Sequence, residues 1–125
     1  MVMLAHIVFE NIDNEVATYS RFIIEKLLRK KFNFKGLVIS DDISMKALKD
    51  DMIEIVKKSY NGGCDVVLYC SGILDEMKEI YPYVKIIDLE LFKYFNKKCK
   101  NVKIKEKDLA RYKNELAKFE IIKLK

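Results

Sequence analysis

Two aspartates, Asp41 and Asp42, follow a short apolar segment, Leu37–Ile39, from which only Ser40 separates them. Consecutive apolar residues are typical of a strand covered on both faces. In parallel α/β proteins, ligands and reacting groups gather at the carboxyl ends of such strands. A carboxylate there can cap a helix, bind Mg²⁺, accept a phosphoryl group, act as an acid or base, or attack a substrate carbon. Capping is the commonest of these roles, and Asp42, two residues before Ser44, fits it well.

Three apolar segments are expected to form the strands that position these carboxylates. The expected strands are Val2–Phe9, Leu37–Ser40 and Asp65–Cys70. An amphipathic segment from about 20 to 31 predicts a helix with Ser20 as its N-cap. Its expected apolar face comprises Phe22, Ile23, Leu27 and Leu28. Further helices are expected at about 51–60, ended by the glycines at 62 and 63, and at about 74–81, ended by Pro82.

The expected strands begin about thirty residues apart, which is also the average unit of a (β/α)₈ barrel of about 250 residues. A doubly wound sheet would suit the spacing equally well. A complete barrel would not, because only three strands are expected. After Pro82 the pattern changes to a short apolar run at 84–87 and to helices at about 88–100 and 107–119. We expect one domain over 1–125, with βα units in 1–81 and a helical tail in 82–125.

Composition excludes several classes of protein. Half of the 125 residues are hydrophobic, 34% are charged, and the net charge is +5. These values predict a soluble globular domain. The lysines spread over helix faces, which favours a solvated surface over a nucleic-acid-binding patch. No apolar run is long enough to span a membrane, and the apolar start lacks the basic leader of a signal peptide. Three widely spaced cysteines predict free thiols, no zinc site and a cytoplasmic location.

Several motifs, in the right order, resemble glycoside hydrolase family 3, and in particular its β-N-acetylhexosaminidase branch. The segment Leu27–Ser44, LLRKKFNFKGLVISDDIS, resembles the active-site signature of that family. Ser40–Met45 matches the pattern S-D-D-x-x-M of the branch. The segments that resemble its neighbouring elements are Val2–Val8, Thr18–Ile23 and Gly63–Leu68. The resemblance covers about residues 1–75 and implies an α/β fold: the last three β/α units of a (β/α)₈ TIM-type barrel, followed by a C-terminal helical tail.

The resemblance also implies an activity. A retaining β-N-acetylhexosaminidase of this branch would remove β-linked N-acetylglucosamine from cell-wall-derived muropeptides in the cytoplasm. It would need no cofactor and no metal. The implied partner is therefore a carbohydrate substrate, an N-acetylglucosaminide, and neither nucleic acid nor a membrane.

Carried over by position, Asp41 would be the catalytic nucleophile. A retaining mechanism needs an ionised carboxylate beneath the anomeric carbon, where it forms a covalent glycosyl–enzyme intermediate. A rigid strand end positions such a group well. The resemblance implies that Met45 contacts the bound sugar. His6 lies in an apolar segment, where a lone histidine is more often a hydrogen-bonded core residue. Because the family has a histidine at the matching place, His6 is a candidate for lining the substrate site, but not for the acid.

A second group must protonate the leaving oxygen. In this branch, that group is a histidine on a mobile loop, supported by an aspartate, and basic residues of a K-H-F-P-G-type motif bind the sugar. This sequence has no such motif, and its only histidine is His6. We therefore expect the chain to be inactive alone. It would be either a truncated gene product or a half that needs a complementary N-terminal half.

Two other functions remain open from the residues. In a receiver-like signalling module, strand-end carboxylates bind Mg²⁺ and accept a phosphoryl group. That fold needs its acidic pair after the first strand and another aspartate after the third. Here the pair follows the second expected strand, and the third ends in Tyr69-Cys70-Ser71. The other alternative is a non-catalytic binding fragment, whose lysine-rich tail docks on an acidic partner with a steep dependence on salt.

Overall fold

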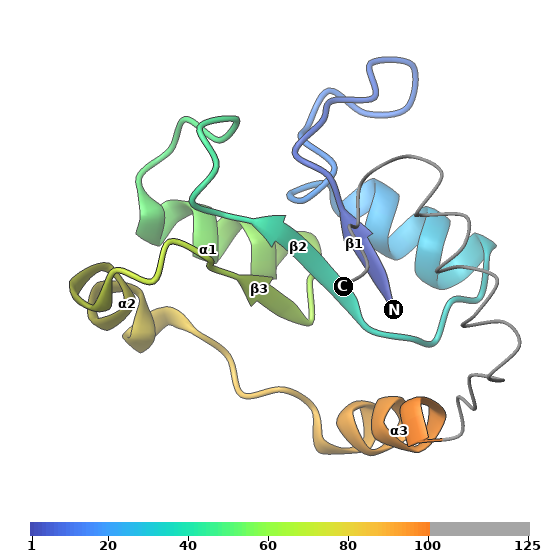
Figure 1. Cartoon of the computed structure of the whole chain (residues 1–125). Helices are drawn as coiled ribbons and strands as arrows, with labels where there is room; N and C mark the ends of the chain where they lie inside the picture. Colours follow the sequence, from blue (N-terminus) through green and yellow to red (C-terminus); the bar gives the residue numbers. More distant parts are fainter. Residues whose placement is uncertain (101–125) are drawn as a thin grey trace, which may run out of the picture. The chain divides into compact units, whose positions relative to one another are not determined.

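The computed structural model of the chain describes residues 1–100. Its elements are β1 (Val2–Leu4), the π-helix η1 (Phe22–Lys31), β2 (Val38–Asp42), α1 (Met52–Gly62), β3 (Val66–Leu68), α2 (Leu74–Ile80), the 3₁₀-helix η2 (Tyr81–Tyr83) and α3 (Leu89–Lys100), as Figure 1 shows. One compact unit comprises residues 1–95, and a second begins at Asn96, within α3. The sheet and the candidate site belong to the first unit.

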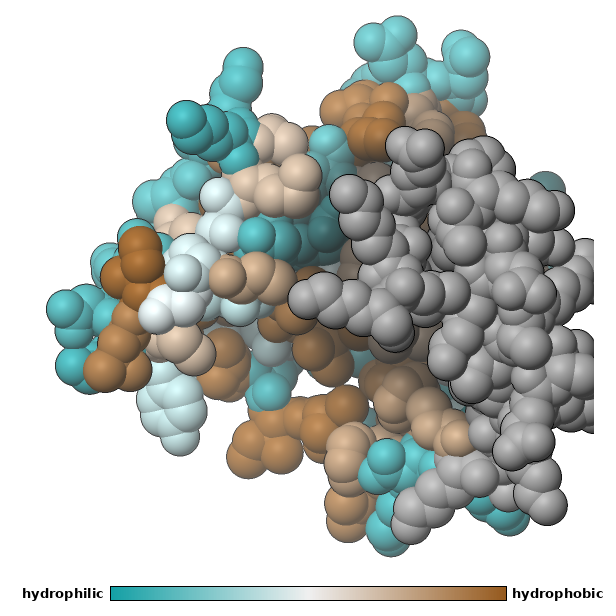
Figure 2. All heavy atoms as spheres, viewed as in Figure 1, coloured by the Kyte–Doolittle hydropathy of each residue, from teal (hydrophilic) through white to brown (hydrophobic). Residues whose placement is uncertain are grey.

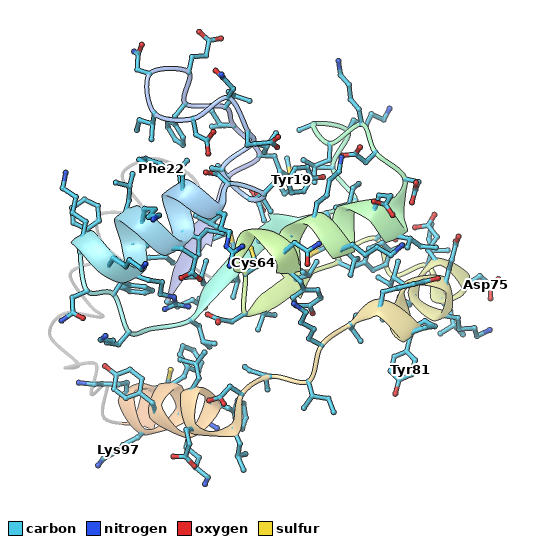
Figure 3. All side chains as sticks on the ribbon, turned by 180° about the vertical axis from the view of Figure 1, so that it is seen from behind. Tyr19, Phe22, Cys64, Asp75, Tyr81 and Lys97 are labelled. Carbon is cyan, nitrogen blue, oxygen red and sulfur yellow. The ribbon has the colours of Figure 1, made fainter. Side chains whose placement is uncertain are left out.

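The three strands form one parallel sheet in the order β1-β2-β3. Met3 lies beside Ile39, which lies beside Val66, and the pairing becomes irregular between Ile39 and Asp42. Helices η1 and α1 lie on the same face of this sheet; Figure 3, seen from behind, shows both in front of it. The expected α/β class, with parallel strands in sequence order, is confirmed.

Two apolar clusters join the sheet to its helices. The first comprises Leu4, Ile24, Val38 and Cys64, and the second comprises Ile43, Leu48, Ile55, Val56, Tyr60 and Ile80. Val38 and Val56 are fully buried, and burying a side chain of this kind stabilises the fold by about 1.5–3 kcal/mol. Since side chains alternate along a strand, the neighbours Met3 and Ile39 lie on the sheet face away from these helices. Met3 is 50% exposed.

The strand ends differ from the prediction. β1 stops at Leu4 instead of Phe9, because the chain then turns: Val8 forms an isolated antiparallel bridge with Val16, and the Ile12 N–H donates to the Phe9 carbonyl at 2.7 Å. The exposed apolar side chains of this loop are Ile7, Val8, Phe9 and Ile12. Figure 2 shows hydrophobic surface over this loop, at the upper right. Conversely, β2 continues to Asp42, two residues beyond its expected end, and β3 is shorter than 65–70.

The helix η1 begins where its sequence predicts, but it buries a different face. The Ser20 hydroxyl accepts the Ile23 N–H at 3.0 Å, as expected of a capping serine. Ile23 and Ile24 are buried, whereas Phe22 is 46% exposed. The expected apolar face was therefore wrong at Phe22 and missed Ile24. A π-helix has i→i+5 hydrogen bonds, so an apolar face assigned at α-helical spacing is out of register with it.

The remaining helices have the expected ends to within two residues. The Asp51 carboxylate caps α1 by accepting the Glu54 N–H at 3.0 Å, and Gly63, with φ 115°, ends it. Asp88 caps α3 by accepting the Leu91 N–H at 2.8 Å. The apolar run at 84–87 forms neither strand nor helix. The helix expected at 107–119 lies outside the described residues. Within residues 1–100, no helix has the length and apolar character needed to cross a membrane.

Candidate active site

Asp41 lies at the carboxyl end of β2, and its side chain is partly exposed. Its Oδ1 accepts the backbone N–H of Asp42 at 2.8 Å. Its other carboxylate oxygen has no hydrogen-bond donor within residues 1–100. One oxygen is thus oriented by the backbone, and the other is available to a ligand.

Asp42 has a different role, because both oxygens of its carboxylate already accept hydrogen bonds. Oδ1 accepts the backbone N–H groups of Ser44 and Cys70, both at 3.0 Å, and Oδ2 accepts the Ser44 hydroxyl at 2.7 Å. The Ser44 hydroxyl is the main cause that lowers the pKa of Asp42, and the two backbone donors act in the same direction. Asp42 closes the turn after β2 and ties it to the segment after β3. It does not cap a helix as expected, because residues 43–49 form no helix and the next one, α1, is capped by Asp51.

Two of the three candidate residues of the sequence, His6 and Met45, contact one atom, the backbone carbonyl oxygen of Asp42. It accepts a hydrogen bond from His6 Nε2 at 3.0 Å and lies 3.2 Å from the Met45 backbone nitrogen, which also donates to it. Asp41 is the preceding residue. The loop after β1, the end of β2 and the turn after β2 thus bring His6, Asp41 and Met45 together. The Met45 side chain is 46% exposed.

The two ring nitrogens of His6 are both engaged. Nδ1 lies 2.9 Å from the hydroxyl of Thr18, and Nε2 lies 3.0 Å from the Asp42 carbonyl oxygen. Thr18 is fully buried. Releasing a proton from this ring to a leaving group would require breaking one of these contacts. The geometry therefore agrees with the interpretation that His6 is not the general acid.

A second polar cluster lies at the opposite, amino end of β2. The Asp65 Oδ2 accepts the Arg29 guanidinium at 2.6 Å and the Val38 backbone N–H at 2.7 Å. Arg29 also donates to the carbonyls of Phe34, at 3.1 Å, and Gly36, at 2.7 Å. We call Arg29 and Asp65 the β2 clamp. Both residues belong to the motifs quoted above, but the sequence analysis gave them no role. Their opposite charges were the only feature of the sequence that could have indicated this pairing.

One surface hollow of about 420 Å³ is lined by Arg21, Phe22, Glu25, Lys26 and Lys30, on η1. It includes none of the three candidate residues. Among residues 1–100, no group of three His, Cys, Asp or Glu side chains is arranged to hold a metal ion.

A parallel α/β sheet with a partly free carboxylate at its carboxyl edge defines a class of strand-end sites to which many hydrolases belong. Residues 1–111 match the sequence model described as the glycosyl hydrolase family 3 N terminal domain. The chain therefore belongs to glycosyl hydrolase family 3.

Relatives within this family are named beta-hexosaminidase, beta-N-acetylglucosaminidase or NagZ. A beta-hexosaminidase of Actinobacillus succinogenes is 32% identical over 110 residues, which cover 80% of this chain and 32% of that protein. The β-N-acetylglucosaminidase of Thermotoga maritima is 37% identical with a TM-score of 0.59, over 66% of this chain and 18% of that one. NagZ from Neisseria gonorrhoeae, in complex with N-trifluoroacetyl-D-glucosamine, is 29% identical with a TM-score of 0.55, over 67% of this chain and 24% of that one.

The chain thus spans between 18% and 32% of the length of these relatives. The receiver-like alternative is not supported. In the structure the acidic pair ends β2, the second strand, and the family match points to a glycosidase. The binding-fragment alternative relied on the lysine-rich tail, most of which lies outside the described residues.

Proposed function

We propose that this chain supplies the nucleophile and the last three β/α units of a retaining β-N-acetylhexosaminidase barrel. The observation that carries the proposal is the setting of Asp41 in a chain of this family. The carboxylate ends a parallel strand, the Asp42 N–H holds one of its oxygens at 2.8 Å, and the other is open. The carboxylate of Asp42, the other member of the pair, already accepts three hydrogen bonds.

In the proposed reaction, the open oxygen of Asp41 attacks the anomeric carbon of the substrate. The bond from that carbon to the leaving-group oxygen breaks, and this oxygen takes a proton from an acid outside residues 1–100. Water then attacks the anomeric carbon of the glycosyl–Asp41 ester and gives a proton back to the same outside group. The bond between that carbon and Asp41 breaks, which restores the carboxylate and releases the sugar. Met45, which is exposed and lies in the turn after β2, would contact the sugar. His6 would line the site from the side of β1.

The proposed substrate is a β-linked N-acetylglucosaminide of the kind present in cell-wall muropeptides. The Neisseria relative binds an N-acylated glucosamine, and the other relatives are named for hexosaminides or N-acetylglucosaminides. Recycling of muropeptides in the cytoplasm is the role that fits this substrate. No cofactor takes part in the proposed chemistry.

The proposed active form needs further β/α units, either from the same polypeptide or from a complementary N-terminal half. Three strands leave a parallel sheet with two unpaired edges, and a barrel removes such edges. The sheet face that a barrel would enclose carries Met3, which is 50% exposed. The acid and the remaining walls of the sugar site would come from those units.

Hydrolysis of a chromogenic N-acetyl-β-glucosaminide tests the proposal, measured for the chain with and without a separately expressed N-terminal half of a relative. We expect turnover only with the added half and its loss, by at least a hundredfold, in Asp41→Ala. Activity that survives Asp41→Ala would disprove the assignment of the nucleophile. Turnover by the chain alone that disappears in Asp41→Ala would disprove only the need for a second half.

A further inference from the structure

His6 connects three segments that are far apart in the sequence. It lies just after β1, and its ring contacts Thr18, which is 12 residues away, and Asp42, which is 36 residues away. Thr18 precedes η1, and Asp42 ends β2. A side chain that joins these segments fixes their positions relative to one another at the carboxyl edge of the sheet.

The partners of the ring determine where its hydrogen lies. The Asp42 carbonyl oxygen can only accept, so His6 Nε2 must donate to it across 3.0 Å. In the neutral imidazole, Nδ1 is then an acceptor, and the Thr18 hydroxyl, 2.9 Å away, is its donor. The carbonyls of Leu4 and Ala5 lie farther from that hydroxyl, at 3.3 Å. The contacts therefore select one neutral tautomer, with the hydrogen on Nε2.

The bond from His6 reaches Asp41 through the backbone of a single residue. The Asp42 carbonyl is held by His6 Nε2 and by the Met45 N–H, while the Asp42 N–H holds Asp41 Oδ1 at 2.8 Å. Rotation of the Asp42 backbone would turn this N–H away from Asp41. The ring contact opposes that rotation.

We propose that His6 is a positioning residue for Asp41 and does not itself contact the substrate. Its Nε2–H holds the Asp42 carbonyl, and through the Asp42 backbone it keeps the free oxygen of Asp41 in a fixed direction. The functional part of this inference rests on the proposed function of Asp41 as nucleophile. The geometric part can be tested without any activity.

The first test is the tautomer of His6 in the full chain, measured at mildly alkaline pH by long-range ¹H–¹⁵N correlation on ¹⁵N-labelled protein. Since His6 is the only histidine of the sequence, its signals need no assignment. We expect the pattern of the Nε2–H tautomer. The Nδ1–H pattern, or an equal mixture of the two, would overturn the proposal.

The second test is amide hydrogen exchange in His6→Leu, which lacks a donor, and in His6→Gln, which keeps one. In His6→Leu we expect exchange of the Asp42 amide to accelerate about fivefold, which is the loss of about one hydrogen bond. The Val56 amide in α1 should be unchanged, and His6→Gln should restore most of the protection. An unchanged Asp42 amide, or an equal acceleration at Val56, would overturn the proposal.

Two further variants keep the test decisive. Ser44→Ala removes a bond to the Asp42 carboxylate but leaves the carbonyl contacts intact, so the His6 tautomer should remain Nε2–H. If His6→Leu does not fold, Thr18→Val removes the donor to Nδ1, together with the longer contacts of that hydroxyl to the Leu4 and Ala5 carbonyls, but leaves the Asp42 carbonyl as an acceptor for Nε2. The ring should therefore remain in the Nε2–H form, and a change to the Nδ1–H form would contradict the tautomer argument.

Activity then separates the two proposals. In the assembled enzyme, a positioning role predicts that His6→Leu lowers kcat with little change in KM, and that His6→Gln recovers much of the loss. A rise in KM with unchanged kcat would instead indicate a substrate contact and overturn the inference. If Asp41→Ala stays active while the tautomer and exchange results hold, the proposed function fails and the role of His6 as a support of Asp42 remains.

Discussion

Removing the Asp65 carboxylate should destabilise the fold by about 3 kcal/mol. Asp65→Ala leaves the Val38 N–H, on a fully buried residue, without its acceptor, and an unsatisfied buried donor costs about 1–3 kcal/mol. The ion pair with Arg29 has side chains that are each 21% exposed, so we assign it roughly 1 kcal/mol after screening by solvent. Asp65→Asn keeps an acceptor for the Val38 N–H, so it should lose only the roughly 1 kcal/mol of the ion pair.

The assay is urea unfolding of the full chain, monitored by circular dichroism. The slope of the free energy of unfolding against urea concentration is compared between variants. Asp75→Asn is the matched control, because its pair with Lys78 is 90% and 67% exposed and lies at the surface of α2 (Figure 3). We expect it to change the free energy of unfolding by less than about 0.5 kcal/mol. The order should be Asp65→Ala, then Asp65→Asn, then Asp75→Asn. Equal effects of Asp65→Ala and Asp75→Asn would refute the reasoning that burial and the backbone donor give the β2 clamp its strength.

Three other predictions concern the turn after β2, a buried thiol and a helix contact. The ionised Asp42 stabilises the fold above the ordinary pKa of an aspartate, about 3.9, and this contribution is lost as the pH falls through its lowered native pKa. Asp42→Asn should therefore lose less stability on acidification than the wild type in urea unfolding across pH, and parallel curves would contradict this. Burial raises the pKa of the Cys64 thiol to about 12, whereas Cys70 is exposed. Mass spectrometry after maleimide treatment of the native chain should therefore show labelled Cys70 and unlabelled Cys64. Equal labelling rates of the two thiols would be inconsistent with the structure. Gly62→Ala would place a Cβ 2.6 Å from the Tyr19 carbonyl oxygen. It should therefore lower the free energy of unfolding by about 1–3 kcal/mol, despite the better helix propensity of alanine. A stabilised variant would show that α1 can shift to relieve this contact.

The sequence predicted the sheet better than the ends of its strands. Val38 and Ile39 were recognisable because consecutive apolar residues are typical of a covered strand. The end of β1 was not, because the apolar character continues to Phe9 while the chain leaves the sheet after Leu4. Apolar composition does not distinguish a strand from a loop whose apolar side chains remain 40–53% exposed. That distinction depends on which segments pack against the loop.

The candidate site was predictable only in part, for a similar reason. Asp41 could be chosen over Asp42 from a motif, and the two side chains do lie in different settings. The contacts of His6 could not be predicted, since Thr18 and Asp42 are 12 and 36 residues away and only the folded sheet brings them together. The same holds for the pairing of Arg29 with Asp65, which are also 36 residues apart.

Strand β2 is held at both ends, by Asp65 at Val38 and by His6 at Asp42. Shifting it by one residue would break both attachments and would exchange the faces on which its two aspartates lie. The assignment of the nucleophile therefore depends on register as well as on residue type. Gene annotation in this family would gain from inspecting residues such as Asp65 and His6 before an aspartate pair is accepted as a working site.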